Sequence, residues 1–174
     1  TELWKSDGTT AGTSMVKDIN PTLTWGGSNS NPNYLTAVGN ILFFQADDGN
    51  GSTLWSSAGT AAWTVKIGIQ ERIPNDSSCN RNDLQGFAEM GTSSTSPAFF
   101  FAADGGLLST GCELWKSDGT TAGTSMVKDI NPTFTWFGHS SYPDDLTVMG
   151  STLFFSANDG TNGTELWKSD GTES

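Results

Sequence analysis

The stretch ELWKSDGTTAGTSMVKDINPT occupies residues 2–22 and occurs again, letter for letter, at residues 113–133. The motif starts once more as TELWKSDGT at residues 164–172, and a degenerate copy, STLWSSAGTAAWTVKI, occupies residues 52–67. The tryptophans of the four copies are Trp4, Trp55, Trp115 and Trp167. Their spacings of 51, 60 and 52 residues indicate a repeat array, in which each unit buries a face against its neighbour.

A second repeated block precedes the ELW motif in each unit. It reads LTAVGNILFFQADDG at residues 35–49 and LTVMGSTLFFSANDG at residues 146–160, while the middle unit has LQGFAEMG, an insertion and PAFFFAADG. Short runs of aromatic and β-branched residues between Gly, Asp and Asn turns are typical of strands. We therefore predict an all-β chain of tandem four-stranded antiparallel, blade-like repeats, arranged as a β-propeller or as an open repeat array.

The repeats define one domain over residues 1–174. Counted from the ELW motif, its units occupy approximately 1–51, 52–111 and 112–163, and residues 164–174 start a further unit. Closed propellers need about four to eight blades, so three units are too few. Because the chain begins and ends in the same phase, we expect either that the repeat continues beyond it or that copies join head to tail.

Charge and hydropathy exclude two classes of partner. The chain has 8 basic and 19 acidic side chains, a net charge of -11, which repels phosphate and argues against nucleic-acid binding. No apolar run approaches the roughly 18–20 residues that a membrane-spanning helix needs, so we expect no membrane insertion. An acidic surface of this kind is compatible with divalent cations.

The chain contains two cysteines, and both lie where the repeat departs from its own pattern. Cys79 is in the loop that lengthens the middle unit, and Cys112 replaces the threonine that precedes ELW at Thr1 and Thr164. We predict a disulfide between them, which implies an oxidising compartment. Two independent buried thiols are the alternative.

Acidic turns recur before each ELW motif and are the candidate metal site. The residues are Asp47, Asp48, Asp104 and Asp159. Ca²⁺ binds six to eight oxygens, which loops rich in Asp and Asn can supply. In the alternative interpretation, Asp and Asn before Gly build tight turns by accepting hydrogen bonds from nearby backbone N–H groups.

Aromatic residues in polar loops are the candidate ligand or partner contacts. Whereas the ELW tryptophans repeat with the fold and are expected in the core, a second set does not; it comprises Trp25, Trp136, Phe137 and Tyr142. Such side chains can stack on sugar rings, anchor a protein interface or pack locally beneath a loop.

Three asparagines match the N-glycosylation acceptor pattern, namely Asn50, Asn75 and Asn162. Asn50 and Asn162 occupy the equivalent turn of two units. In a eukaryotic secretory pathway we expect them to be candidates for glycosylation; in a bacterium the match is coincidental.

The motif itself resembles a known family. ELW, a two-residue gap, DGT, AGT and VKDI occur in order at residues 2–19 and 113–130, as in the ELWxxDGT repeat family of bacterial secreted and surface proteins. The resemblance implies a propeller-like architecture and a secreted location, but no reaction. The copy at residues 52–67 lacks the glutamate and has Ala58 in place of the aspartate of DGT.

These observations favour an extracellular structural or adhesive module over an enzyme. His139 is the only histidine, so no Ser-His-Asp arrangement is expected and we predict no catalytic residues. The expected partners are further copies or repeats of the same kind, in a head-to-tail filament or a larger repeat protein. A lectin-like, glycan-binding propeller module is the alternative.

Overall fold

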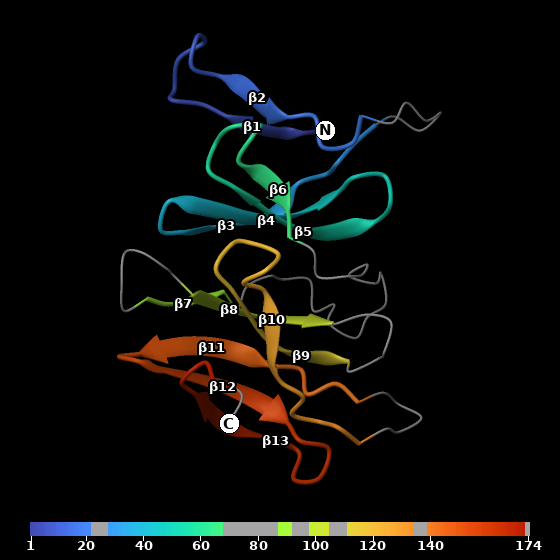
Figure 1. Ribbon diagram of the computed structural model, residues 1–174, viewed down its shortest axis with the longest axis vertical. Coiled ribbons are helices and arrows are strands. Elements are labelled where there is room, and N and C mark those ends of the chain that lie inside the picture. The colour runs from blue at the N-terminus through green and yellow to red at the C-terminus, as the bar shows by residue number, and fades with distance from the viewer. Residues whose placement is uncertain (22–27, 68–86, 92–97, 105–110, 134–138, 173–174) are drawn as a thin grey trace. The chain divides into compact units, whose positions relative to one another are not determined.

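The computed structural model describes residues 1–21, 28–67, 87–91, 98–104, 111–133 and 139–172. All regular elements in these ranges are strands, β1 to β13, and they form four antiparallel sheets (Figure 1). The chain divides into two compact units, Thr1–Ile67 and Gly68–Ser174. Each unit contains two of the sheets.

Unit 1 contains a two-stranded sheet and a four-stranded sheet. The first pairs β1 (Leu3–Lys5) with β2 (Ser14–Lys17). The second has the order β3-β4-β5-β6 and consists of β3 (Asn33–Val38), β4 (Ile41–Asp47), β5 (Ser52–Ser57) and β6 (Thr64–Lys66). Every strand pairs with its neighbour in sequence, so the four-stranded sheet is a simple meander.

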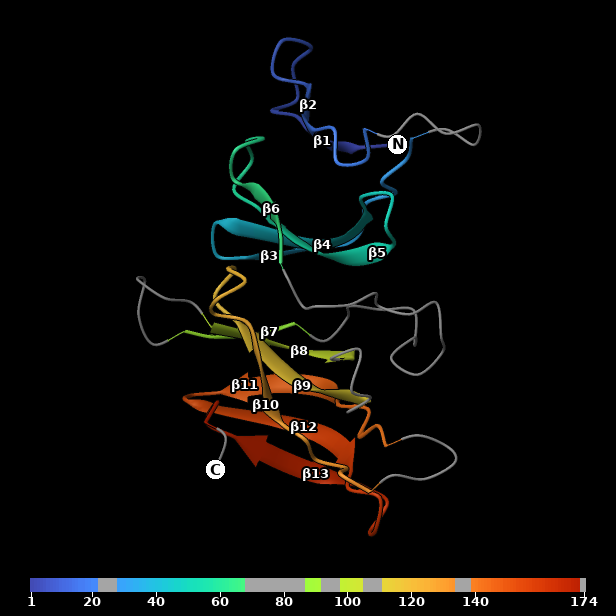
Figure 2. The same ribbon diagram turned by 45° about the vertical axis from the view of Figure 1, so that its right-hand side comes forward.

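Unit 2 contains a four-stranded sheet and a three-stranded sheet. The order β10-β9-β8-β7 is built from β7 (Ala88–Met90), β8 (Ala98–Asp104), β9 (Cys112–Ser117) and β10 (Ser125–Lys128). The order β11-β12-β13 is built from β11 (Asp144–Met149), β12 (Thr152–Asn158) and β13 (Thr164–Ser169). The two sheets of this unit pack face to face in both ribbon views (Figure 1, Figure 2).

The prediction of an all-β chain with antiparallel sheets is confirmed, and two of the four described sheets have the predicted four strands. Each four-stranded sheet follows the order LTxxG, LFFxA, ELW and its following strand, so a unit counted from ELW contains strands of two sheets. No sheet among the described strands closes on itself.

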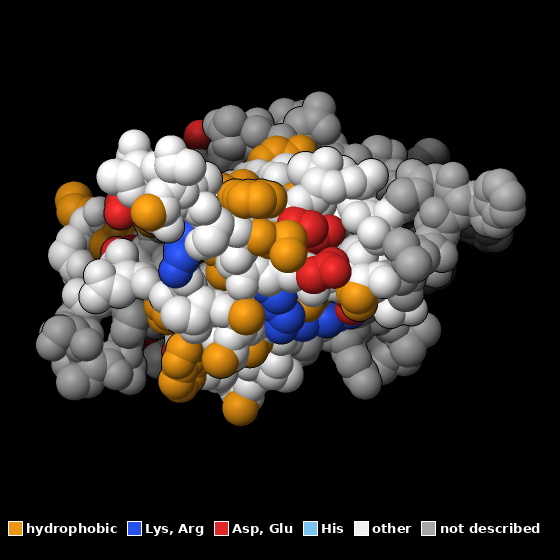
Figure 3. Space-filling model, turned by 90° about the horizontal axis from the view of Figure 1, so that it is seen from above, with side chains coloured by type: hydrophobic (Ala, Val, Ile, Leu, Met, Phe, Trp, Pro, Cys, Tyr) orange, Lys and Arg blue, Asp and Glu red, His pale blue; other side chains and the backbone are white. Residues whose placement is uncertain are grey.

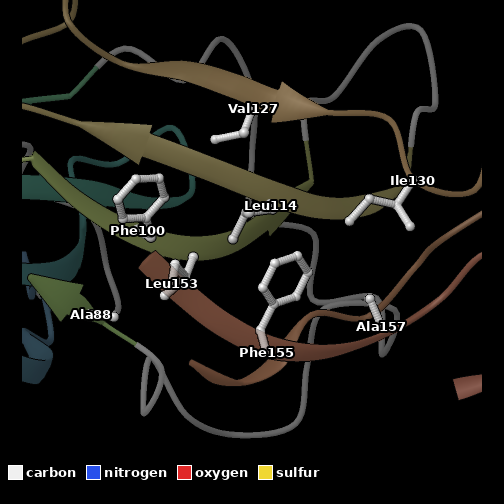
Figure 4. Close-up of a cluster of buried hydrophobic side chains, with 8 residues drawn as sticks. All are labelled: Ala88, Phe100, Leu114, Val127, Ile130, Leu153, Phe155 and Ala157. Carbon is white, nitrogen blue, oxygen red and sulfur yellow. The ribbon is translucent and has the colours of Figure 1, made fainter. Parts of the chain in front are cut away.

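The two units repeat the same core at residue numbers that differ by 111, as in Leu3 and Leu114, or by 112 for the tryptophan. In unit 1 the core lies between the two sheets and consists of Leu3, Val16, Ile19, Phe44, Ala46 and Trp55. In unit 2 the equivalent positions are Leu114, Val127, Ile130, Phe155, Ala157 and the partly buried Trp167. Figure 4 shows side chains of β9 and β10 meeting those of β12. Period-2 alternation explains the pattern, because successive residues of a strand point to opposite faces.

The SDGT turn after each ELW strand is stabilised by its own side chains. Asp7 Oδ1 accepts hydrogen bonds from Thr9 N at 2.9 Å and Thr9 Oγ1 at 2.7 Å, and these bonds lower the pKa of Asp7. A Cβ atom at Gly12 would overlap this carboxylate, so the glycine makes room for it. The degenerate copy has lost both partners, with Ala58 and Trp63 at the equivalent positions.

Candidate functional site

Both units contain the same interface between their two sheets. We call this interface, with its apolar core and its polar contacts, the joint. At its centre in unit 2 lies Glu113, the glutamate of ELW, whose side chain is 0% exposed. Its carboxylate accepts hydrogen bonds from Ile130 N at 2.9 Å, Ser141 N at 2.9 Å and Ser141 Oγ at 2.6 Å. We call Glu113, Ile130 and Ser141 the glutamate clasp of unit 2. It ties strand β9 to the segments that follow β10 and precede β11.

The serine of the clasp extends the connection into the next sheet. The carbonyl oxygen of Ser141 accepts a hydrogen bond from Asn158 N in β12 at 2.8 Å. A continuous polar path therefore runs from Glu113 in one sheet to Asn158 in the neighbouring sheet. It lies beside the apolar core and fixes the register in which the two sheets pack.

Unit 1 contains the same clasp. Glu2 accepts hydrogen bonds from Ile19 N at 2.9 Å, Ser30 N at 3.1 Å and Ser30 Oγ at 2.6 Å. The carbonyl oxygen of Ser30 accepts one from Asp47 N at 2.8 Å. Glu2 is half-buried whereas Glu113 is buried, so the clasp of unit 2 is better shielded from solvent than that of unit 1.

Burial raises the pKa of Glu113 from its ordinary value of 4.5 to about 7, and nearby Asp129 adds to the rise. Hydrogen bonds from Ser141 and Ile130 oppose it, because they stabilise the carboxylate. Desolvation is the larger effect. The clasp therefore changes its charge near neutral pH.

A lysine adds a second polar contact to each joint. Lys5 Nζ donates to the carbonyl oxygen of Gly59 at 2.8 Å, and Lys116 Nζ donates to that of Gly171 at 2.8 Å. In each case the lysine of one ELWKS strand reaches the SDGT-type turn of the next copy. Gly59 and Gly171 share a left-handed backbone, with φ of 83° and 86°.

The degenerate copy lacks both polar parts of the joint. Thr53 stands where the other copies have the clasp glutamate, and its buried hydroxyl has no hydrogen-bond partner. Ser56 replaces the lysine. The sequence shows that this copy is degenerate. It does not indicate that the glutamate and the lysine replaced here are the residues that connect neighbouring sheets.

In the acidic turns, the aspartate side chains accept hydrogen bonds from nearby backbone N–H groups, as the alternative to a metal site predicts. Asp47 Oδ1 accepts from Gly49 N and Gly51 N, at 2.8 and 3.0 Å. Asp159 accepts backbone hydrogen bonds from Asn162 and Thr161, which lower its pKa. Asp48 pairs with Lys66 at 2.9 Å.

No group of three or more metal-ligating side chains occurs among the described residues, and the side chain of Asp104 lies outside them. Calcium binding at these turns stays a prediction.

The tryptophans of the repeat have different environments. Trp55 is 5% exposed and Trp167 is half-buried, each within the core of its own unit. Trp4 is 60% exposed, so the expectation that every ELW tryptophan packs in the core is wrong for Trp4. Among the loop aromatics, Tyr142 is 49% exposed with a φ of 49°. The other three, Trp25, Trp136 and Phe137, lie outside the described residues.

The cysteine and asparagine predictions fall partly outside the described residues. Cys112 is buried and disulfide-bonded, while Cys79 lies outside them. Asn50 and Asn162 are exposed, and their side chains donate to Asp48 and Asp159 at 3.3 and 2.7 Å. Asn75 also lies outside the described residues, and glycosylation stays a prediction.

Comparisons of the chain with protein-family models, with curated proteins and with solved structures find no match. In the described part of the chain there is no helix with the length and apolar character needed to span a membrane.

Proposed function

We propose that this chain is a structural repeat module of a secreted or surface protein, and that it acts by self-association. The observation that carries the proposal is the joint between sheets. It occurs in both units with the same apolar residues, the same glutamate clasp and the same lysine-to-carbonyl bond. A contact that neighbouring sheets reproduce from identical parts is suited to extending an array.

The sites described above are structural in character. Each buried polar group of the clasp is used to hold backbone segments, and the turn carboxylates hold their own turns. The disulfide at Cys112 supports an oxidising compartment, in line with the secreted location that the ELWxxDGT resemblance implies. The net charge of -11 supports solubility of an assembly that displays apolar faces.

Sedimentation velocity over a range of protein concentrations tests the proposal, and negative-stain electron microscopy identifies the form of the assembly. We expect the average mass to rise with concentration and elongated particles to form. A single species of monomeric mass at every concentration, with no particles larger than one chain, would contradict self-association.

A further inference from the structure

The joint within each unit has two unlike faces. The receiving face presents the leucine of ELW with Val and Ile, which are Leu3, Val16 and Ile19 in unit 1 and Leu114, Val127 and Ile130 in unit 2. The inserting face presents the LFFxA core residues and the tryptophan of ELW, which are Phe44, Ala46 and Trp55, or Phe155, Ala157 and Trp167. Because Leu and Trp are adjacent in ELW, one strand contributes to a receiving face and, on its other side, to an inserting face.

One face of the inserting type is exposed. Trp4 is 60% exposed, whereas the equivalent Trp55 is 5% exposed. Met15 pairs with Trp4 across β1 and β2 and is 44% exposed. Figure 3 views unit 1 from the side of β1 and β2, and it shows apolar side chains at the surface among acidic and basic ones. We call Trp4 and Met15 the tryptophan face.

One face of the receiving type is exposed as well. Leu166 in β13 is 77% exposed, whereas the equivalent Leu3 and Leu114 are 3% and 1% exposed. The neighbouring strand β12 contributes the half-buried Phe154, which points to the same side as Leu166 and away from the unit 2 core. We call Leu166 and Phe154 the leucine face.

We propose that the leucine face of one chain binds the tryptophan face of a second copy, head to tail. This inference rests on the proposed function and names the surfaces through which it operates. The leucine of the receiving face and the tryptophan of the inserting face are then brought together, with Leu166 on one copy and Trp4 on the other. Exposed apolar faces of this kind mark interaction sites, and unlike faces on one chain give a heterologous contact, which forms a ring if its rotation closes and a filament if it does not.

A polar contact sets the register of this interface. Lys168 is exposed and occupies the position of Lys5 and Lys116, which donate to glycine carbonyls of the next copy in sequence. In the intermolecular joint, Lys168 donates to the carbonyl of Gly8 in the second copy. Gly8 has a φ of 90°, which matches the 83° of the acceptor Gly59.

The test uses two variants that each disable one face. Trp4→Asp removes the tryptophan face and Leu166→Asp removes the leucine face, both at exposed positions where the fold tolerates charge. We expect each variant alone to sediment as a monomer. An equimolar mixture keeps one intact face of each kind, so it forms a dimer of one Trp4→Asp chain with one Leu166→Asp chain and nothing larger.

The matched control is Trp63→Asp. Trp63 is 70% exposed in the turn before β6 and belongs to neither face. The control assembles like the unmodified chain. Far-UV circular dichroism establishes that all three variants are folded.

The outcomes separate this inference from the proposed function. If the unmodified chain is monomeric at all concentrations, both the proposed self-association and the inferred pairing of the two faces are wrong. An unmodified chain that assembles while either single variant assembles equally well overturns the inference alone, because another surface is then used. Dimers of Leu166→Asp by itself also overturn it, since two tryptophan faces would then be pairing with each other.

Lys168→Met tests the register. Loss of one charge-assisted hydrogen bond weakens association by about tenfold. Lys128→Met, at an exposed position of β10, leaves association within about twofold of the unmodified chain. Equal weakening by the two variants would overturn the assignment of Lys168 to the interface.

Discussion

Glu113 and Thr53 occupy the same position in two ELW-type strands. The two strands differ in whether that position is hydrogen-bonded to other segments of the chain. Glu113 receives three hydrogen bonds from segments beyond its own strand. Thr53, at the equivalent position, has a buried hydroxyl with no partner. The last residue of the degenerate copy around Thr53 is Ile67, which is also the last residue of unit 1.

The degenerate copy nevertheless forms its sheet. Ser57 and Thr64 share a hydroxyl–hydroxyl hydrogen bond of 2.7 Å, as Ser6 and Thr13 do in the first copy. Gly59 N donates to Ser57 Oγ as its equivalent does in the other turns. The conserved residues of the repeat therefore fall into two sets with different structural roles. Ser, Gly and Thr build the hairpin, whereas the glutamate and lysine join one sheet to the next.

The largest effect is expected from removing the clasp. Glu113→Ala leaves the backbone N–H of Ile130 without its acceptor in a buried site, and Ser141 N and Ser141 Oγ keep only the carbonyl oxygen of Cys112, at 3.0 and 3.2 Å. The free energy of unfolding therefore falls by about 2 kcal/mol. Urea unfolding measures this loss, and hydrogen exchange at the amides of Ile130 and Ser141 locates it. The control is Glu165→Ala, at the equivalent but exposed position of β13, which stays within about 0.5 kcal/mol. Equal losses in the two variants would show that Glu113 does not act through the clasp.

The second effect is on pH dependence. The pKa of Glu113 is about 7 in the folded protein, above its ordinary value of 4.5, so the folded state binds the proton more tightly. This contribution to stability is fully present below about pH 4.5 and is lost as the pH rises through about 7.

Glu113→Gln keeps a hydrogen-bonding side chain of the same shape and cannot titrate. We expect this variant to lose the decline in stability between about pH 4.5 and 7, while Glu165→Gln retains it. Thermal unfolding at a series of pH values gives the comparison. A decline that persists unchanged in Glu113→Gln would assign the titration to another group.

The third effect tests why the degenerate copy lost two turn residues together. A Cβ at Gly123 would overlap the Asp118 carboxylate, which is held by Thr120, so Gly123→Ala costs about 1 kcal/mol. Asp118→Ala removes the carboxylate that a Cβ at residue 123 would overlap. Gly123→Ala therefore lowers the free energy of unfolding less in the Asp118→Ala background than in the unmodified chain. A double-mutant cycle measures the coupling. Strictly additive losses would separate the two positions.

The smallest effect is expected at Thr53. Thr53→Val replaces a buried hydroxyl that has no partner by a methyl group, which stabilises the chain by about 0.5–1 kcal/mol. Thr64→Val is the contrasting control, because Thr64 Oγ1 donates to the carbonyl oxygen of Thr60 at 2.7 Å, and its loss destabilises. Chemical denaturation resolves the opposite signs. Destabilisation by Thr53→Val would indicate a polar partner for that hydroxyl.

Much of the fold could be predicted from local pattern. The LFFxA and ELW segments became β4, β5, β9, β12 and β13, because alternating apolar residues between glycine turns leave the chain few other ways to bury them. The turn-building alternative for Asp47 also follows from residues two to four positions away. These features depend on neighbours in sequence, and the sequence displays such neighbours directly.

The joint could not be predicted in this way. Glu113 is a charged residue in a strand, and its partner Ser141 lies 28 residues further along the chain. Nothing in the letters around either residue indicates the other. The exposure of Trp4 could not be predicted either, because the same residues surround the tryptophan in every intact copy of the motif, whether or not a neighbouring sheet covers it.

The sequence by itself determined the repeat, the all-β class, the antiparallel hairpins and the turns, since all of these arise from short-range stereochemistry and the period of apolar residues. Only the tertiary structure decided which face of each strand is covered, which glutamate is buried and which aromatic remains exposed. The physical reason is that desolvation depends on what lies opposite a side chain. Identical letters at Leu114 and Leu166 are 1% and 77% exposed, because one faces a neighbouring sheet and the other does not.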